Sequence, residues 1–423
     1  MDKICHATSR RKAALVWTTV AFFAGFAGVS AFGPIVPKLK ESMALNPILM
    51  GLLVASPALA GSLLRIPFGA IVDRIGGKIP ILVLLGLSSL GIAGTTILFV
   101  LFPIPEPHHY PLFLSSGVLC GCGIATFSVG IPTVSYWYPQ KKQGVVLALY
   151  GGLGNLAPGL FSFLLPVVVV SMGFFLSYVL WLILLLIVTT LFFFLMKDAP
   201  YFQYKEMGIE IDQEALLIAC GEELVPSGNA MASIKKAASD YRTWILTNFY
   251  FVSFGGFIAL TVWFPTYWIE YFGMTLVQAG ILTALYSLSA SILRVFGGAA
   301  SDFLGGEKVA SASFLIMITG SVLMILPLRS IALAVVGELL LALGMGFANA
   351  AVFKLVPKFM PAAVGGTAGI VGGLGAFGGF VIPVFMGLVV KLVGSSGYPF
   401  GFSVFLVLSA LSFLLLAFLG KFR

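Results

Sequence analysis

The sequence predicts an all-α integral membrane protein with twelve transmembrane helices in two pseudo-symmetric halves of six. Of its 423 residues, 59% are hydrophobic and only 9% are charged, which is too few to cover a water-soluble fold of this size. Apolar stretches long enough to cross about 30 Å of hydrocarbon as helices recur along the chain. Similar segments also recur about half a chain apart. Together these observations predict a membrane bundle built from two related halves.

Twelve apolar stretches of about 20 to 25 residues qualify as transmembrane helices. They cover residues 13–37, 47–72, 79–103, 111–137, 144–171, 174–196, 243–268, 277–302, 309–327, 331–356, 363–390 and 398–420. The first follows a basic segment, Ser9–Lys12, but it is long and lacks a clear small-residue cleavage site. We therefore interpret it as a retained helix rather than a signal peptide.

Lys and Arg residues are distributed unevenly between the two sets of loops. Eighteen of the 24 lie at the termini or in the loops after the second, fourth, sixth, eighth and tenth spans. The opposite loops hold four, which are Lys38, Lys40, Arg329 and Lys391. Positively charged loops resist translocation, so we expect a multi-pass protein of the cell inner (cytoplasmic) membrane with both termini in the cytoplasm. The net charge of +8 follows from this topology and does not indicate nucleic-acid binding.

Internal similarity divides the chain. LLRIPFGAIVDRIGG (Leu63–Gly77) resembles ILRVFGGAASDFLGG (Ile292–Gly306), which pairs Arg65 with Arg294. GGLGNLAPG (151–159) likewise resembles GGLGAFGGF (372–380). We predict an N-terminal half over 1–196, a polar cytoplasmic linker over 197–242 with a short surface helix, and a C-terminal half over 243–423. Two such halves place a substrate site at their interface near the middle of the membrane.

Arg65 and Arg294 are the two basic residues well inside predicted spans. Each precedes the aspartate at the end of its span by eight residues, so it lies about 12 Å deeper along the helix. A central arginine costs at least about 2.5 to 3.5 kcal/mol, which requires compensation. A bound anion would supply it, and the planar guanidinium fork suits a small planar oxyanion. The alternative is structural pairing with Glu338, the acidic residue well inside a span, or with helix carbonyls.

The segment GAIVDRIGGK (Gly69–Lys78) resembles the loop motif between the second and third helices of the major facilitator superfamily, and GAASDFLGGE (Gly298–Glu307) is a degraded copy. Asp73 would cap and pair across helix ends, while Gly69 would permit close packing. The resemblance implies a cytoplasmic gate rather than substrate ligands. The gate residues would be Gly69, Asp73, Arg74, Gly76, Lys78 and Asp302.

Within that superfamily the chain resembles nitrate/nitrite porters of the NarK type. Its glycine-rich segments are similar to that family's paired signatures in the fifth and eleventh helices, and its two arginines fall on the second and eighth. The signature glycines are Gly151, Gly152, Gly154, Gly372, Gly373, Gly375, Gly378 and Gly379. Such helices present smooth faces that let neighbouring backbones approach.

The same resemblance implies the site residues. Arg65 and Arg294 would clasp the anion, and Asn155 of GGLGN would donate a hydrogen bond to it. Tyr250 and Phe254 of FYFVSFGGF, with Phe127 of GIATFSVG, would line the site. Ordinary packing is an alternative for the two phenylalanines, and helix-to-helix hydrogen bonding is one for Asn155. Pro158 departs from the family pattern and is expected to interrupt the fifth helix.

The expected function is transport of nitrate and/or nitrite by alternating access, with exchange of one anion for the other. The alternatives are proton-coupled symport using Glu338, a porter of another small anion, and a non-transporting anion sensor. No nucleophile–base pair or nucleotide loop indicates an enzyme, and the three His and four Cys lack metal-ligand spacing. We expect a monomer in the lipid bilayer with no cofactor and no metal.

Overall fold

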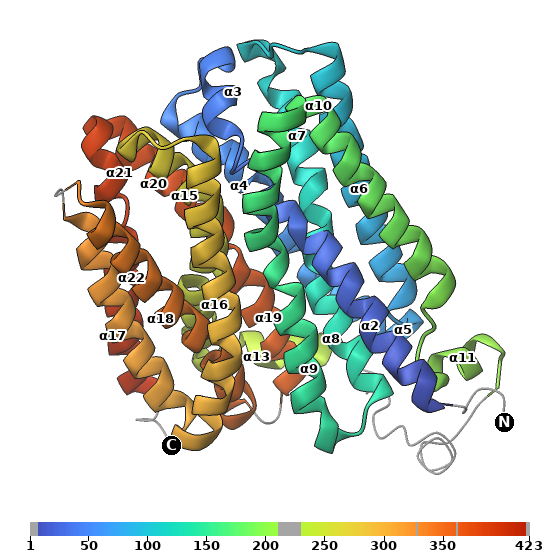
Figure 1. Cartoon of the computed structure of the whole chain (residues 1–423). Helices are drawn as coiled ribbons and strands as arrows, with labels where there is room; N and C mark the ends of the chain where they lie inside the picture. The colour runs from blue at the N-terminus through green and yellow to red at the C-terminus, as the bar shows by residue number, and fades with distance from the viewer. Residues whose placement is uncertain (1–6, 210–229, 327–328, 361–362, 420–423) are drawn as a thin grey trace.

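Long helices run side by side through the computed structural model, which describes residues 7–209, 230–326, 329–360 and 363–419 (Figure 1). The first half of the chain forms α2 (Ala7–Phe26), η1 (Ala27–Ser30), α3 (Val36–Met43), α4 (Pro47–Leu63), α5 (Arg65–Ile75), α6 (Lys78–Leu101), η2 (Pro107–His109), α7 (Tyr110–Cys120), η3 (Gly121–Ala125), α8 (Thr126–Trp137), α9 (Gln140–Gly154), α10 (Leu156–Leu195) and α11 (Pro200–Glu206). The second half forms α13 (Ala230–Ala238), α14 (Tyr241–Tyr250), η4 (Phe251–Gly255), α15 (Gly256–Phe272), α16 (Leu276–Leu304), α17 (Gly306–Ile325), α18 (Ile331–Phe359), α19 (Val364–Ala376), α20 (Gly378–Val393), η6 (Gly394–Ser396), α21 (Gly397–Phe400) and α22 (Ser403–Leu419).

The described helices account for all twelve predicted spans. Ten helical segments are long and apolar enough to cross a membrane, and the longest is Val145–Leu195. That segment contains a break at Gly173, whose φ of 79° and ψ of 172° suit glycine alone, so it holds two of the predicted spans. The last span is the shorter apolar helix α22. The chain is therefore an all-helical multi-pass membrane protein.

The helices form two groups that face each other. In Figure 1 the blue-to-green helices lie on one side and the yellow-to-red helices on the other. Within the first group α10 packs against α6 and α2, and within the second α18 packs against α16 and α17. The groups meet where α4 contacts α20 and where α10 contacts α16. These contacts join the second helix to the eleventh and the fifth to the eighth, which carry the paired motifs of the sequence.

Glycine makes the closest contacts possible. A Cβ at Gly51 of α4 would lie 2.6 Å from the Pro383 carbonyl oxygen, and one at Gly387 of α20 would lie 2.3 Å from that of Pro47. On α20, a Cβ at Gly378 would lie 2.5 Å from the Phe251 carbonyl oxygen. Each of these distances is shorter than a real Cβ atom tolerates. The α20 helix can therefore approach α4 and η4 this closely only because glycine occupies these positions.

We call the end of the bundle that carries α3 and α21 the outer end, and the end that carries α11 and α13 the inner end (Figure 1). At the outer end an ion pair joins the two groups of helices. Lys40 Nζ on α3 lies 2.5 Å from Glu270 Oε2 on α15, and both side chains are partly buried. Tyr398 on α21 interacts with the same carboxylate. This contact holds the two groups together at the outer end.

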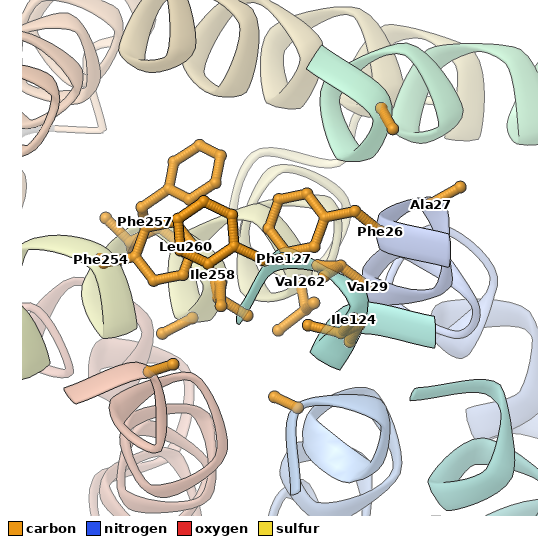
Figure 2. Close-up of a cluster of buried hydrophobic side chains, with 14 of the residues drawn as sticks. Phe26, Ala27, Val29, Ile124, Phe127, Phe254, Phe257, Ile258, Leu260 and Val262 are labelled. Atoms are coloured by element: carbon orange, nitrogen blue, oxygen red, sulfur yellow. The ribbon is translucent and has the colours of Figure 1, made fainter. Parts of the chain in front are cut away.

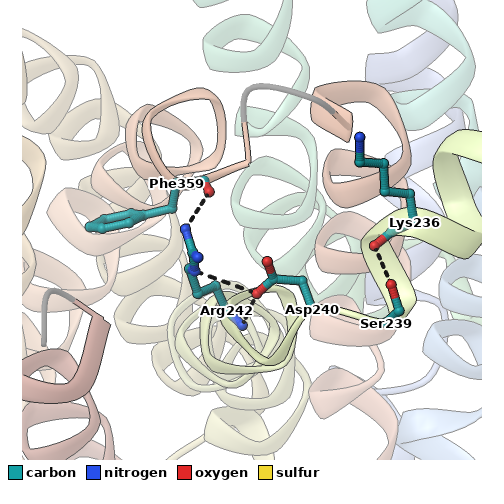
Figure 3. Close-up of polar contacts among 5 residues, drawn as sticks. All are labelled: Lys236, Ser239, Asp240, Arg242 and Phe359. Atoms are coloured by element: carbon teal, nitrogen blue, oxygen red, sulfur yellow. Dashed lines mark hydrogen bonds and ion pairs between the residues drawn. The ribbon is translucent and has the colours of Figure 1, made fainter. Parts of the chain in front are cut away.

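The predicted linker contains two short helices, α11 and α13, where one was expected; its residues 210–229 lie outside the described part. The α13 helix packs on α19, where the Gly366 backbone N–H donates to Ser233 Oγ at 3.0 Å. After it, Asp240 caps α14 by accepting from the Arg242 backbone N–H, and Arg242 Nη1 donates to the Phe359 carbonyl oxygen (Figure 3). The end of the linker is thus fixed to the inner ends of α18 and α19.

Replacing Gly378 with alanine should lower the thermal unfolding midpoint of the purified protein. The added methyl would meet the Phe251 backbone, and overpacking of this kind costs about 1 to 3 kcal/mol. The matched control is Gly369→Ala, because a Cβ at Gly369 meets nothing within 4 Å. Equal midpoints for the two variants, measured in one detergent, would contradict the close packing of α20 on η4.

Candidate functional site

Arg65 lies where the second predicted span breaks into α4 and α5, at residue Leu64. Pro67 has no N–H to donate to the Leu63 carbonyl, which accounts for the break. The Arg65 side chain is 1% exposed, and its Nη1 donates to the Gly372 carbonyl oxygen of α19 at 3.1 Å. Its Nε and Nη2 are buried without a partner among the described residues. Arg65 therefore bridges the two groups of helices and retains free donors.

Arg294 lies on a helix of the other group and is close enough to Arg65 to interact with it electrostatically. It lies within the long helix α16, its side chain is only partly buried, and its Nη1 has no partner among the described residues. The two arginines that the sequence pairs lie beside the same two aromatic rings. Their burial differs, although the sequence motif suggested equivalent positions. The site is therefore more open beside Arg294 than beside Arg65.

Two aromatic rings flank both arginines. The Arg65 guanidinium carbon lies 5.1 Å from the centroid of the Phe127 ring and 5.0 Å from that of Phe254. The Arg294 guanidinium carbon lies 5.6 Å from each. The two ring centroids are 6.1 Å apart, with an interplanar angle of 24°. Both rings therefore lie at an ordinary packing distance from each other and close to both guanidinium groups, and we call the region beside these two rings and the two arginines the slot.

The two rings belong to a larger aromatic cluster. Figure 2 shows Phe127 lying with Phe26 of α2 and with Phe254 and Phe257 of the seventh helix. The centroids of Phe26 and Phe254 are 6.1 Å apart and their rings are nearly parallel. Phe26 was not among the predicted site residues, because it carries no motif and the chain contains 38 phenylalanines. The cluster makes the walls of the site apolar.

Tyr250 adds a polar group. Its ring stacks on Phe254 at 4.8 Å, and its side chain is fully buried. The hydroxyl lies near enough to both guanidinium groups to interact with them electrostatically, but it makes no hydrogen bond of ordinary geometry with a described residue. Phe254 follows in η4, a π-helical turn of the kind often found at functional sites.

Tyr150 is a site residue that the sequence interpretation missed. It is 1% exposed, interacts electrostatically with Arg65, and donates its hydroxyl hydrogen to the carbonyl of Thr126 at 2.9 Å or of Phe127 at 3.1 Å. It thereby fixes the backbone that positions the Phe127 ring. A tyrosine directly before the first glycine signature was the available signal.

Asn155 lies at the junction of α9 and α10. Pro158 has no N–H for the Gly154 carbonyl, so the expected interruption occurs here, three residues before the proline. The Asn155 side chain is 2% exposed and its Oδ1 has no partner in the described part of the chain. Its carbonyl oxygen accepts from Ser291 Oγ at 2.9 Å, one turn before Arg294. The backbone at Asn155 is thus held beside the helix of Arg294.

The second glycine signature packs around the site. A Cβ at Gly375 would lie 2.8 Å from Tyr250 Cβ, and one at Gly373 would lie 2.7 Å from Ile66 Cγ1. In the first signature a Cβ at Gly154 would overlap the Phe22 ring, whereas one at Gly151 would meet Phe127 only at 3.8 Å. Close approach therefore explains several of the predicted glycines but not Gly151.

The predicted gate residues bond within their own group of helices. Asp73 accepts from the Tyr136 hydroxyl at 2.6 Å, and Asp302 pairs with Lys354. The predicted close packing at Gly69 is wrong, because a Cβ there would be 3.7 Å from the Ser128 oxygen, an ordinary contact. A methyl group would fit without displacing either helix.

Asp198 completes the gate segment and was missed by sequence reasoning. Its carboxylate accepts from the backbone N–H groups of Gly77 and Lys78 at 2.7 and 3.0 Å and so caps α6. Burial raises the pKa of Asp198, while the two N–H donors act in the opposite direction. Arg74 takes part through its backbone, whose carbonyl accepts from Lys205 Nζ at 3.0 Å. Gly76, with φ of 80°, ends α5 in a conformation that favours glycine.

Glu338 lies on α18, away from the arginines. It is fully buried, and neither carboxylate oxygen has a hydrogen-bond partner of ordinary geometry among the described residues. Its electrostatic neighbours are Trp268, Tyr286 and Tyr267. The alternative that Glu338 compensates Arg65 or Arg294 therefore has no contact to support it. Helix carbonyls compensate Arg65 in part, through Gly372.

No group of three or more His, Cys, Asp or Glu side chains that could hold a metal ion occurs within the described ranges. The polar groups gathered at the centre are instead hydrogen-bond donors with positive charge. Such a set of donors can bind a small anion.

Comparisons with known proteins give a matching family model and similar relatives for this chain. A family model described as "Major Facilitator Superfamily" matches residues 18–368 and 246–422. The chain is 29% identical over 389 residues to a "Probable nitrate transporter NarT" of Staphylococcus haemolyticus, covering 91% of each chain. It is 28% identical over 391 residues to a protein of the same name from Staphylococcus epidermidis, covering 92% of each.

Solved structures share the fold at much lower identity. The xylose transporter XylE from E. coli in a partially occluded inward-open conformation superposes with a TM-score of 0.72 at 15% identity, covering 98% of both chains. The human organic anion transporter MFSD10 gives a TM-score of 0.67 at 16% identity, covering 96% of this chain and 99% of its own. At these identities the likeness concerns the fold alone.

Proposed function

The chain belongs to the major facilitator superfamily and is a secondary transporter, and we propose that it carries nitrate and nitrite across the cytoplasmic membrane. The observation that carries the proposal is the arrangement of two guanidinium groups beside the same two aromatic rings. The names of the relatives point to the same substrate. The fold makes the protein a transporter rather than an enzyme.

The aromatic rings beside the two arginines favour a planar ion. A flat anion can lie against the face of a ring while the guanidinium groups bond its edge. A tetrahedral anion such as phosphate is thicker and fits less closely against a ring. Arg65 and Arg294 would then bond the edge of the planar ion, Tyr250 would contribute its hydroxyl, and Asn155 would donate from the fifth helix.

The charges favour exchange of one anion for another. Two guanidinium groups close together in a site of low dielectric constant repel each other, and a monovalent anion between them offsets that repulsion. Closing the two groups of helices around the arginines is therefore easier with an anion bound than without one. Obligatory exchange follows, with nitrate entering as nitrite leaves.

In proteoliposomes, labelled nitrate should enter vesicles that contain nitrite or nitrate and should not enter empty vesicles. Excess nitrite should compete with this uptake, whereas phosphate and carboxylates should not. Uptake of equal rate into empty vesicles with a pH gradient would contradict obligatory exchange. Binding of nitrate without any flux would instead identify a sensor.

Arg65→Lys and Arg294→Lys should each reduce nitrate exchange by about tenfold or more, because an ammonium group keeps the charge but loses the planar fork of donors. Lys38→Met is a matched control, since Lys38 lies near the Phe174 ring, away from the site. Retention of wild-type exchange by both arginine variants would remove the proposed site.

A second candidate function, proton-coupled symport, rests on Glu338. A carboxyl group buried among aromatic side chains in a membrane helix, with no hydrogen-bond partner of ordinary geometry among the described residues, is the type of group that carries protons in transporters. The titratable groups around it are Tyr267 and Tyr286. Aromatic contacts connect it to the anion slot, since Phe257 lies 5.9 Å from Phe254 and 6.2 Å from Tyr286.

Glu338→Gln distinguishes the two modes. Under exchange alone, the variant should retain nitrate/nitrite exchange at a rate near that of the wild type, and a pH gradient should drive no uptake in either protein. Under symport, the wild type should accumulate nitrate when the outside is acidic, and the variant should lose this accumulation while keeping exchange. The pH-driven flux of the two proteins, measured side by side, decides between them.

A further inference from the structure

A second buried amide, Asn349 on α18, is left without a role by the site as described so far. Its side chain is 3% exposed, and its Oδ1 is buried without a hydrogen-bond partner among the described residues. A buried amide without a partner is costly, so such a residue in a helix of a membrane bundle requires an explanation. Asn155, the proposed ligand on the fifth helix, is likewise a buried amide whose Oδ1 has no partner among the described residues.

The residues one turn before and one turn after Asn349 on α18 show which neighbouring segment this face of the helix packs against. Met345 lies one turn before it and contacts the seventh helix, where a Cβ at Gly256 would be 2.9 Å from Met345 Cε. Phe353 lies one turn after it, and its ring is 5.0 Å from the Tyr250 ring in a T-shaped arrangement. Residues four apart share a helix face, so Asn349 faces the segment between Tyr250 and Gly256. That segment contains Phe254.

A contact on the other flank of α18 narrows the position further. A Cβ at Gly346, three residues before Asn349, would lie 3.2 Å from the Arg294 backbone nitrogen and 2.6 Å from the Ala290 carbonyl oxygen. The Asn349 face therefore lies between the turn of α16 that carries Arg294 and the π-helical turn η4. These two turns supply the less buried arginine and one wall of the aromatic slot.

The facing turn offers a group that would orient the amide. Ser253 of η4 is fully buried, and its Oγ has no partner within the described residues. An anion accepts hydrogen bonds only, so it must meet the NH₂ group of an asparagine, and the carbonyl of that asparagine then needs a donor from the protein. The Ser253 hydroxyl, on a turn that α18 contacts, would supply this donor.

We propose that Asn349 is a further substrate-binding residue, which donates a hydrogen bond to an oxygen of the planar anion that the two arginines leave unbonded. The proposal rests on the proposed transport of nitrate and nitrite. Nitrate has three oxygens and nitrite has two, so an additional hydrogen-bond donor beyond the arginine pair strengthens the binding of nitrate more than that of nitrite. Asn349 is thus a specificity-determining residue that favours nitrate over nitrite.

The test uses Asn349→Leu in proteoliposomes loaded with nitrite, with half-saturation constants measured for external nitrate and for external nitrite. Loss of a hydrogen bond to a charged ligand should raise the constant for nitrate by about tenfold or more. The constant for nitrite should change by less, so the ratio of the two constants shifts. An unchanged ratio would overturn the proposal.

Asn248→Leu is the matched control. The Asn248 amide lies on α14, in the first part of the seventh helix, and already donates to Ser412 Oγ of α22 at 2.9 Å. Its loss should change stability and rate without changing the nitrate-to-nitrite ratio. If Asn349→Leu fails to fold, Asn349→Ala, which is smaller and has no donor, gives the ratio instead, and the same shift or its absence decides.

Arg65→Lys separates this proposal from the proposed function. If Arg65→Lys loses exchange of both ions while Asn349→Leu leaves the ratio unchanged, the transport site stands and the role of Asn349 is wrong. If Arg65→Lys exchanges both ions as the wild type does, the transport site itself is wrong.

Discussion

The placement of two guanidinium groups beside one pair of aromatic rings is the constraint on which the rest of the structure depends. Burying Arg65 almost completely requires acceptors or an anion, and the chain supplies one carbonyl, that of Gly372. The remaining donors of Arg65 and the buried Nη1 of Arg294 have no described partner. The protein therefore holds positive charge at its centre that is only partly compensated from within, and this is the physical basis of an anion site.

Several helices around these groups depart from regular geometry at the level of the site, whereas α16, which carries Arg294, is continuous. The α4–α5 junction precedes Arg65, the α9–α10 junction contains Asn155, η4 contains Phe254, and the α19–α20 junction at Phe377 follows Gly372. In the first two junctions a proline lies three residues after the break, at Pro67 and Pro158. Broken helices at a central site are typical of secondary transporters, because they turn polar backbone and side chains toward the ligand. They also divide each helix into an outer and an inner part.

The sequence predicted the parts of this arrangement that follow from charge and repetition. Twelve apolar spans, the two arginines within them and the close packing of the glycine-rich segments could be derived, because hydrophobic length and internal similarity report directly on helix number and pairing. Tyr150, Asp198 and Asn349 could not, since their importance depends on which helix faces cross in space. The different burial of Arg65 and Arg294 was also hidden, because matching motifs carry no information about unlike neighbours. The same is true of Gly69, whose motif suggested a tight contact that the structure lacks.

The central claim is that the site selects a planar anion of single charge. The most direct measurement is the affinity of the purified protein for nitrate compared with perchlorate, which has the same charge but a tetrahedral shape, by calorimetric titration at one ionic strength. The account predicts saturable binding of nitrate and at least about tenfold weaker binding of perchlorate, because only a flat ion can lie against the aromatic rings while its edge meets both guanidinium groups. Equal binding of the two ions would show that charge alone is recognised and would contradict the account.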